Sequence, residues 1–492
     1  MWNLWPAESP TWTLNSYEEL MKAESKESSD KITLQQIVSN SDVFPVEFPI
    51  DSIRCKNLAG RIAQVTLEEN INSAYPVVHE QTLLLYSKFL EHKRKFGNEV
   101  EREIYKDMTL DMLVDRLLTR RAVAFVGRYD SYMLMDGLKR SGNWELIGTP
   151  HEADPVTLKN CLSYDEIKLS ALLSVSSYTQ FINVGDRDNC GVTEYDKNKI
   201  EERGIIVGLI GARFEKPGAM EYQEVVVTQD QNLPENGYGN TLVATTKSIF
   251  LNFYGEASAT YEQLKHQFDD KTKFTPIRTD QYFNNMVYER RLALSIDTFL
   301  IEANERARSV GTMAYLHVVG IGLGVWRVSK HQNKVFMDTC AKRIELLSTT
   351  LDYIDAVCFS YMRELACGKY QNGDVVPIEH HHNNGITIHI FDRNPHEKLK
   401  APYEGHLLVV SYAWDGNALP GNEFWWGQLT ASGDPAAASS TQIAEIHNPH
   451  INPTVSGANL KVATPNGLLT LKEYQRFFDQ HRVRRQHKEV SA

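Results

Sequence analysis

Apolar residues recur at helical spacing through much of the first part of the chain. Two amphipathic stretches, over residues 83–90 and 110–118, place leucine and aromatic side chains on one face of a helix. Ser163 stands three residues before Glu166 and opens an apolar run, which is the capping-box signature of a helix start. These patterns predict a mainly helical region over residues 41–185.

From Gly204 onward the pattern changes to short apolar runs rich in β-branched residues. We expect strands at 205–210, 225–228, 314–319, 356–361, 386–391 and 407–412. Helical stretches lie between them over 279–308, with Gly311 as a stop signal, and over 333–353. Fully apolar strands separated by helices predict an α/β fold with a sheet that is covered on both faces.

The length of 492 residues predicts more than one domain. We expect residues 1–40 to be a mobile N-terminal segment, because they are polar and rich in Ser, Glu and Lys around 24–31. No Gly- or Pro-rich linker follows the helical region, so 41–185 should pack on the next domain. That domain is expected over 186–460, and residues 461–492 should form a C-terminal helix and a basic tail around Arg482, Arg484, Arg485 and Lys488.

Composition and charge narrow the class of protein. A hydrophobic content of 42% and a charged content of 23% fit a globular chain. The net charge of −11 would repel nucleic acid, and no apolar run approaches the roughly 20 residues that a membrane span needs. The six cysteines include no CxxC pair, so we expect reduced thiols and a cytoplasmic location.

A run of three histidines at 380–382, with His389 nearby, is the one feature that could suggest a metal site. Adjacent residues on an extended chain cannot all face one ion, and no cysteine partner follows at zinc-finger spacing. The chain also lacks the GxSxG, Walker A and HExxH signatures. We therefore expect neither a metal nor a cofactor.

The first candidate ligand loop follows the strand expected at 205–210. It begins with Gly211 and Ala212, and small residues at the end of a strand let a ligand approach the backbone closely. Glu221 follows the Pro217-Gly218 pair and could meet the hydroxyl groups of a ribose. A surface turn with an exposed glutamate explains this segment about as well.

The second candidate loop follows the strand expected at 314–319 and alternates glycine with apolar residues. Glycines free backbone N–H groups to face an anion, and a following helix would add attraction for phosphate. The spacing is not GxGxxG, and a tight turn that needs glycine for packing is the alternative. The candidate binding residues are Gly320, Gly322, Leu323, Gly324, Val325 and Trp326.

The third candidate loop leaves the strand expected at 407–412 and carries Asp415, Glu423 and Asp434 among three aromatic residues. Carboxylates beside apolar surface are what the cleavage of a glycosidic bond requires, and long loops in compact domains are usually functional. The candidate binding residues in this loop are Trp414, Asn417, Asn422, Ser432 and Gly433.

Each of the three acids also has a structural alternative. Asp434 stands before Pro435, which suits a helix N-cap followed by proline at the first helical position. Asp415 before Gly416 is a turn signal. Glu423 could simply be an exposed side chain.

In these segments the chain resembles the atypical macrodomain ADP-ribosylhydrolases of the MavL type, which are related to poly(ADP-ribose) glycohydrolase. The resemblance rests on GARFEKPGAMEYQE, HVVGIGLGVW, SYAWDGNALPGNEFWW and SGDPAAASS, in that order. It covers roughly residues 120–455 and is weaker before Gly204. It implies a macrodomain-like three-layer α/β/α sandwich that binds ADP-ribose, preceded by the mainly helical region.

The resemblance further implies hydrolysis of ADP-ribose from arginine side chains, with an ADP-ribosylated protein as the partner and ubiquitin as one candidate. The family's essential acids fall on Asp415, Glu423 and Asp434. The family pattern has aspartate at the middle position, so Glu423 departs from it by one methylene. The double-glutamate signature of the glycohydrolase is not intact, because only Pro217-Gly218 and Gln223-Glu224 resemble it.

These observations lead to a hypothesis for the reaction. Asp415 would orient or deprotonate the attacking water, and Glu423 or Asp434 would fix the distal ribose and stabilise an oxocarbenium-like state. A reader that binds ADP-ribose without cleaving it, a polymer glycohydrolase, and an interaction protein in which the loops are turns remain as alternatives. In the helical region, Arg120, Arg121 and residues 128–130 could contact a substrate protein, although packing explains them as well.

Overall fold

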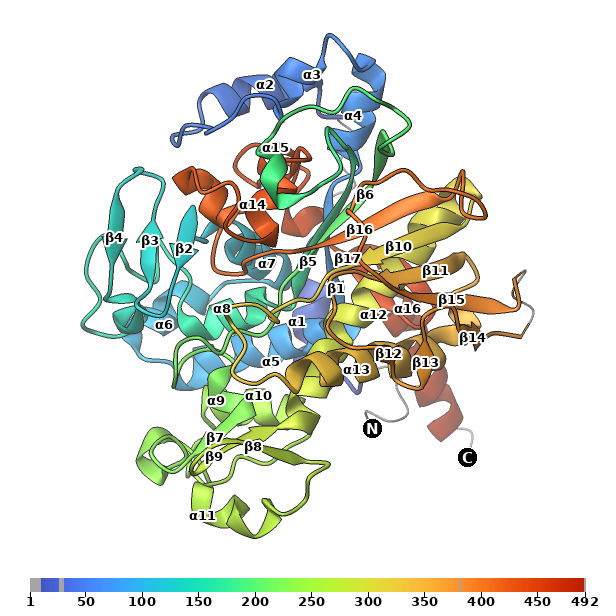
Figure 1. Cartoon of the computed structure of the whole chain (residues 1–492). Coiled ribbons are helices and arrows are strands. Elements are labelled where there is room, and N and C mark those ends of the chain that lie inside the picture. Colours follow the sequence, from blue (N-terminus) through green and yellow to red (C-terminus); the bar gives the residue numbers. More distant parts are fainter. Residues whose placement is uncertain (1–9, 26–30, 380, 382, 491–492) are drawn as a thin grey trace.

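The computed structural model describes residues 10–25, 31–379, 381 and 383–490, with side chains up to residue 480 (Figure 1). Parts of the segment expected to be mobile, 1–9 and 26–30, lie outside the described residues. Between them and after them the chain forms helix α1 (Leu14–Lys22) and helix α2 (Leu34–Asp42). His380, His382 and the side chains of the basic tail also lie outside this description.

A sheet of ten strands runs through the molecule. In spatial order its strands are β14 (Val375–Pro377), β15 (Gly385–Ile390), β11 (Ile354–Phe359), β10 (Ala314–Val318), β16 (Leu407–Ala413), β6 (Arg203–Leu209), β5 (Leu173–Gln180), β1 (Tyr75–His79), β17 (Lys461–Thr464) and β18 (Gly467–Thr470).

Five neighbouring strands of this sheet, from β15 to β6, are parallel to one another. Their carboxyl ends therefore meet at one edge of the sheet, which is where ligands bind in open α/β sheets. Strand β5 is antiparallel to both β6 and β1, and β17 is parallel to β1. The chain is thus a mixed α/β protein.

Five of the six strands expected after Gly204 are confirmed in this sheet. The strand expected at 225–228 is also present, as β7 (Val226–Thr228), but it pairs with β9 (Gln281–Asn284) in a separate sheet with β8 (Phe274–Arg278) and does not join the large sheet. The small sheet has its own aromatic core, in which Phe268 and Tyr282 stack at 3.7 Å. A short apolar run does not reveal which sheet it joins.

Both long helices expected in this part are present. Helix α12 (Asn285–Val310) starts later than residue 279 because the preceding residues form β9, and the side chain of Asn284 accepts a hydrogen bond from the Val287 N–H at 3.1 Å. It ends at Gly311, which has a left-handed φ of 67°. Helix α13 (Gln332–Leu347) ends earlier than residue 353 and gives way to a short 3₁₀ turn.

Alternate side chains of the sheet face two different layers. On one face Val318 and Val357 pack with residues of α12 and α13 around an apolar cavity. On the other face Tyr315, Leu408 and Val410 pack with Phe181 and Leu399, which lie on connecting segments. Helix α14 (Gly433–Ala438) also lies on β16.

The region expected to be mainly helical contributes both helices and strands. Among its helices are α5 (Glu80–Phe96), α6 (Glu99–Tyr105), α7 (Leu110–Thr119) and α8 (Tyr164–Ser170). It also supplies β1 and β5 to the large sheet, and β2 (Ala124–Val126), β3 (Ser131–Met133) and β4 (Lys139–Ser141) to a three-stranded sheet. Residues on both sides of position 185 are thus joined through the pairing of β5 with β6.

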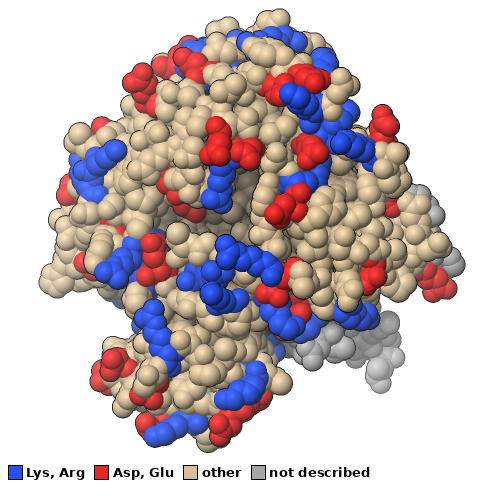
Figure 2. Space-filling view, viewed as in Figure 1, with Lys and Arg blue, Asp and Glu red and all other residues tan. Residues whose placement is uncertain are grey.

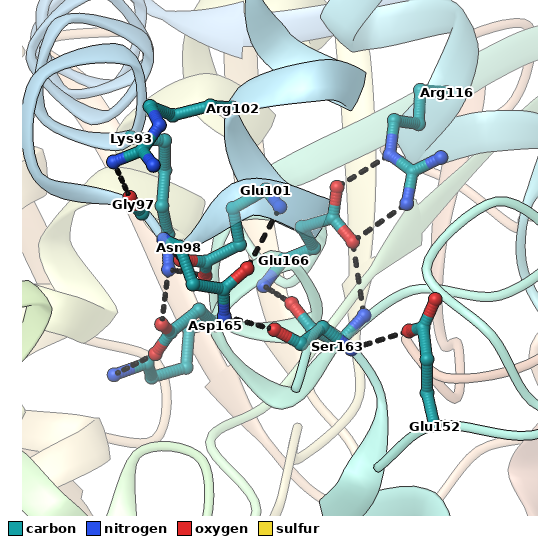
Figure 3. Close-up of polar contacts among 12 residues, drawn as sticks. Lys93, Gly97, Asn98, Glu101, Arg102, Arg116, Glu152, Ser163, Asp165 and Glu166 are labelled. Carbon is teal, nitrogen blue, oxygen red and sulfur yellow. Dashed lines mark hydrogen bonds and ion pairs between the residues drawn. The ribbon is translucent and has the colours of Figure 1, made fainter. Parts of the chain in front are cut away.

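Buried ionic contacts fix helix α8 to its neighbours (Figure 3). The capping box of Ser163 and Glu166 is confirmed. The same Glu166 carboxylate accepts a hydrogen bond from Nη2 of Arg116 at 3.0 Å, and Lys93 reaches Asp165 at 3.1 Å. These contacts hold the segment after α7 in place, and that segment contacts the third loop described below through a bridge between Ala122 and Ala418.

The remaining elements are short or peripheral. They are α3 (Cys55–Leu58), α4 (Gln64–Asn72), α9 (Tyr222–Val225), α10 (Thr246–Phe253), α11 (Tyr261–Leu264), α15 (Ile443–Ile446), α16 (Leu471–Val490), β12 (Ala366–Cys367) and β13 (Tyr370–Gln371). Within the described part of the chain, none of the helices combines the length and apolar character that crossing a bilayer requires.

Candidate active site

The three candidate loops emerge at the same edge of the sheet. They follow β6, β16 and β10, which are adjacent and parallel. The face toward which these loops project is hollowed, and acidic and basic side chains both gather around the hollow (Figure 2). The topology therefore brings together segments that are up to two hundred residues apart in the sequence.

The first two loops touch through their backbones at two glycines. A Cβ atom on Gly211 would stand 2.2 Å from the N atom of Gly322 and 2.5 Å from its Cα. Gly322 itself has a φ of 67°, and a Cβ there would meet the carbonyl oxygen of Ala212 at 2.8 Å. The Phe214 N–H also donates to the carbonyl of Trp326 at 3.1 Å. Only glycine fits at this contact.

Asp434 ties the third loop together from inside the protein. Its side chain is fully buried, and its two oxygens accept hydrogen bonds from the backbone N–H of Gly421 at 2.8 Å and of Asp415 at 3.0 Å. The N-cap interpretation of Asp434 was wrong, because the cap of α14 is Ser432 and Asp434 lies within the helix. The carboxylate faces the N–H groups of another segment and not those of its own helix.

Asp415 follows β16 directly and is half-buried. One of its carboxylate oxygens accepts a hydrogen bond from Nδ2 of Asn422. Asn422 is itself fixed, since its Oδ1 accepts from the Phe125 N–H at 2.7 Å and its Nδ2 also donates to the Phe125 carbonyl at 3.1 Å. Strand β2 thereby orients Asp415 through one buried amide.

Glu423 lies in the 3₁₀ helix η6 (Asn422–Trp426), which is flanked by Gly421 and Gly427 in left-handed conformations. Its side chain is half-buried and accepts a hydrogen bond from the Ser432 hydroxyl at 3.2 Å. Glu423 is therefore partly accessible, and its carboxylate is held by a residue next to α14.

Burial and neighbouring charges shift the pKa values of all three acids. Burial and the charges of Glu423 and Asp434 raise the pKa of Asp415 well above its usual range. Burial chiefly raises the pKa of Glu423 as well, and burial together with the charge of Glu423 raises that of Asp434. Neighbouring carboxylates with raised pKa values are typical of sites for acid–base chemistry.

Comparison with known proteins identifies the family. The family model described as ADP-ribosylhydrolase MavL-like matches residues 35–477. The chain belongs to this family. It is also 43% identical to ADP-ribosylarginine hydrolase CG2909 of Drosophila melanogaster over 450 residues, which are 90% of this chain and 89% of that protein. A second relative, ADP-ribosylarginine hydrolase CG3568 of the same organism, is 42% identical over 489 residues, which are 96% of this chain and 95% of the relative.

In this MavL-like protein the glycine loop after β10 is partly exposed. Gly324 and Val325 are exposed, whereas Gly320, Gly322, Leu323 and Trp326 are half-buried. Helix α13 begins at Gln332, close to the start expected at residue 333, so a further turn separates it from the glycine run.

Other residues proposed to bind ligand are buried in the protein. The Trp414 indole donates to the carbonyl of Ala418 at 3.1 Å, and Asn417 and Asn422 are also buried. The carboxylate of Glu221 faces the N–H of Arg213 at 3.3 Å and Nη2 of Arg291 at 3.5 Å. These buried side chains therefore support the segments that form the site and do not line it themselves.

Sequence reasoning gave no role to Arg213, which lies in the first motif. It is buried, and its guanidinium faces the rings of Phe125 at 5.0 Å and Trp326 at 5.8 Å. It also pairs with Glu215 at 3.0 Å, and its charge opposes the rise in the pKa of Asp415. An arginine directly after a Gly-Ala pair is the signal that could have identified it.

An Asn422→Ala variant should lose stability and turnover together. The N–H and carbonyl of Phe125 would lose their partner, Asp415 would lose a hydrogen-bond donor, and alanine would have to adopt the φ of 34° seen for Asn422. Each unsatisfied buried group costs about 1–3 kcal/mol. We expect the free energy of unfolding to fall by about 2 kcal/mol, as measured by chemical denaturation.

The matched control is Asn198→Ala, because Asn198 is exposed and its amide contacts only neighbouring Asp196. An Asn422→Ala protein with the stability of the wild type would show that the amide does not anchor the loop.

Proposed function

We propose that this protein hydrolyses the N-glycosidic bond that links ADP-ribose to arginine side chains of proteins. Family membership and two relatives named as ADP-ribosylarginine hydrolases support the activity. The observation that carries the proposal is the convergence of three carboxylates beside the contact between two glycine loops, at the carboxyl edge of parallel strands.

We further propose that the ligand domain is a macrodomain-like three-layer α/β/α sandwich. Helices α12 and α13 would form one layer, the parallel strands the second, and α14 with the neighbouring segments the third. In this arrangement the loops after β6, β10 and β16 form the rim of the ADP-ribose site, because ligands of open α/β sheets bind at the carboxyl ends of the strands.

Two subsites follow from the chemistry of the loops. The backbone of 320–325, which is exposed at Gly324 and Val325, would meet the pyrophosphate, because N–H groups in a glycine-rich turn suit an anion. The distal ribose would lie between Gly211 and the acids, so that its anomeric carbon faces Asp415. The protein substrate would approach from the open side of the hollow.

Asp415 is the residue that we assign to the attacking water. Burial and neighbouring charge raise the pKa of Asp415, and a raised pKa makes its carboxylate a stronger base. Asn422 holds one oxygen of this carboxylate, which leaves the other available to water. The bond that breaks joins the anomeric carbon to a guanidine nitrogen, and the water oxygen takes the place of that nitrogen on the carbon.

Glu423 and Asp434 have different roles in this proposal. Glu423 is partly accessible, so it would contact ribose hydroxyl groups and stabilise positive charge on the sugar. Both oxygens of Asp434 already accept backbone hydrogen bonds, so we assign it to holding Asp415 and Gly421 in place.

Cleavage of poly(ADP-ribose) receives less support from the contacts. Glu224, which stands nearest the double-glutamate signature of the glycohydrolase, is buried and pairs with Lys168 at 2.8 Å. Its carboxylate is therefore engaged away from the acids. A reader function would need the glycine loops but would not account for three converging carboxylates.

The proposal is tested with protein substrates that carry one ADP-ribose on arginine, serine or glutamate, together with poly(ADP-ribose). We expect free ADP-ribose to be released from the arginine substrate. Binding of ADP-ribose without release from any substrate would indicate a reader, and faster release from the polymer would indicate a glycohydrolase. ADP-ribosylated ubiquitin belongs in the panel as one candidate substrate, and we expect the enzyme to act in the cytoplasm.

A further inference from the structure

Arg121 lies behind the acids rather than on the surface that a substrate protein would contact. It follows helix α7, and only 4% of the residue is exposed. The next residue, Ala122, forms a bridge with the third loop, with the Ala122 N–H donating to the Asn417 carbonyl at 3.2 Å. Arg121 therefore belongs structurally to the acidic loop, although almost three hundred residues separate them.

The guanidinium of Arg121 holds the turn that follows Asp415. Its Nη1 donates to the carbonyl of Gly416 at 2.6 Å, and its plane lies over the Trp414 ring at 4.1 Å. Its Nε and Nη2 donate to the carbonyls of Leu117 at 2.8 Å and Ser170 at 3.4 Å. One side chain thus contacts the residues on both sides of Asp415.

The charge of Arg121 is buried without a direct carboxylate partner. In the described part of the chain, each of its hydrogen bonds ends on a carbonyl oxygen. Burial lowers the pKa of Arg121 to about 9, so it remains charged at neutral pH. Burying a charge without such a partner is costly, and a packing role alone does not explain a cation at this place.

The negative charges that this cation can offset are those of the acid cluster of Asp415, Glu423 and Asp434. The titratable and charged groups that face Asp434 are Asp415, Glu423, Tyr412 and Arg121. Among these Arg121 is the cation, and its charge opposes the effects of burial and of Glu423 on the pKa of Asp434. An ionised Asp434 can accept hydrogen bonds on both oxygens, as the loop requires.

We propose that Arg121 is a positioning residue of the active site, which fixes the turn around Asp415 and supplies a positive charge that, together with that of Arg213, offsets the acid cluster. It acts through Asp415 and Asp434 and does not touch the substrate. The inference rests on the proposed hydrolysis and assigns to the helical region a part in the chemistry. It also gives a reason why Arg121, which precedes β5 in the sequence, packs against the loop that carries Asp415.

The test compares three variants by the pH dependence of kcat on arginine-linked substrate. Arg121→Gln removes the charge. Arg121→Lys keeps the charge but loses the three guanidinium hydrogen bonds. Ser170→Ala removes a hydroxyl that contacts the carbonyls of Gly416 and Ile167, both at 3.0 Å. Loss of a nearby positive charge raises the pKa of a carboxyl group, so a base needs a higher pH to become active. We expect the rising limb for Arg121→Gln to move upward by about one pH unit.

We expect Arg121→Lys and Ser170→Ala to keep the rising limb of the wild type, with kcat reduced about tenfold in the lysine variant. A folded Arg121→Gln enzyme with the wild-type pH profile would overturn the inference. If the glutamine variant does not fold, a shifted limb in Arg121→Lys would overturn it. Failure of the wild type to release ADP-ribose would instead overturn the proposed function.

Discussion

An Asp415→Asn variant should release ADP-ribose from modified arginine at least about 100-fold more slowly than the wild type, because general bases contribute about 10²–10⁴-fold. The amide oxygen can still accept the hydrogen bond from Asn422, so the loop keeps its shape. ADP-ribose should therefore bind within a few-fold of the wild-type affinity. Single-turnover release and calorimetric titration measure the two quantities separately.

The same variant should be more stable than the wild type. Three neighbouring carboxylates, of which Asp434 is buried and the other two are half-buried, repel one another, and removing one charge relieves this repulsion. A carboxyl group whose pKa is raised by folding binds more protons in the folded state, so its contribution to stability falls as the pH rises through that pKa. The stability gain from Asp415→Asn should therefore be larger at pH 8 than at pH 5.

The control for Asp415→Asn is Asp352→Asn, which changes an exposed aspartate in the turn before β11. Turnover by Asp415→Asn at the wild-type rate would contradict the role assigned to Asp415. A loss of turnover with an equal loss of ADP-ribose affinity would make Asp415 a binding residue instead.

Replacing Gly211 by alanine should separate the two glycine loops. The new Cβ would lie within 2.5 Å of three backbone atoms of Ile321 and Gly322, and backbone atoms cannot rotate away as a side chain can. Overpacking of this kind typically costs 1–3 kcal/mol, and fixed backbone places the expected loss of stability at the upper end, about 3 kcal/mol. ADP-ribose affinity should fall more than tenfold, which calorimetry would detect.

Gly60→Ala serves as the control for this substitution, because Gly60 is exposed, has an ordinary φ and has no atom within 4 Å of the position where a Cβ would be. Wild-type stability and affinity in the Gly211→Ala protein would mean that the contact between the two loops is dispensable.

Much of the fold from Gly204 onward could be predicted because its strands are buried on both faces. Largely apolar runs such as Ile354–Phe359 and Leu407–Ala413 reveal such strands, and their parallel order places the following loops at one edge. Two strands before Gly204 escaped the prediction. Tyr75–His79 and Leu173–Gln180 carry proline, serine and threonine between helical patterns, and only their pairing partners reveal that they join the sheet.

The acids of the candidate site could be found from the sequence, but the separate role of each acid could not. Motif order identified Asp415, Glu423 and Asp434, whereas the two backbone hydrogen bonds to Asp434 depend on how the loop folds back. Arg121 and Arg213 could not be assigned from their sequence neighbours. Both are buried, and their charges oppose the rise in the pKa values of Asp434 and Asp415, but burial leaves no local pattern in the sequence.

The position of β1 has a consequence for how the protein can be made. Val77 lies beside Ser174 on one side and Lys461 on the other, so an early segment of the chain is enclosed between a middle and a late one. During synthesis β1 must wait for its second neighbour until nearly the whole polypeptide has left the ribosome, and such distant pairings slow folding. A fragment that starts at Gly204 would also lack two inner strands, so expression of the catalytic half alone should yield insoluble material.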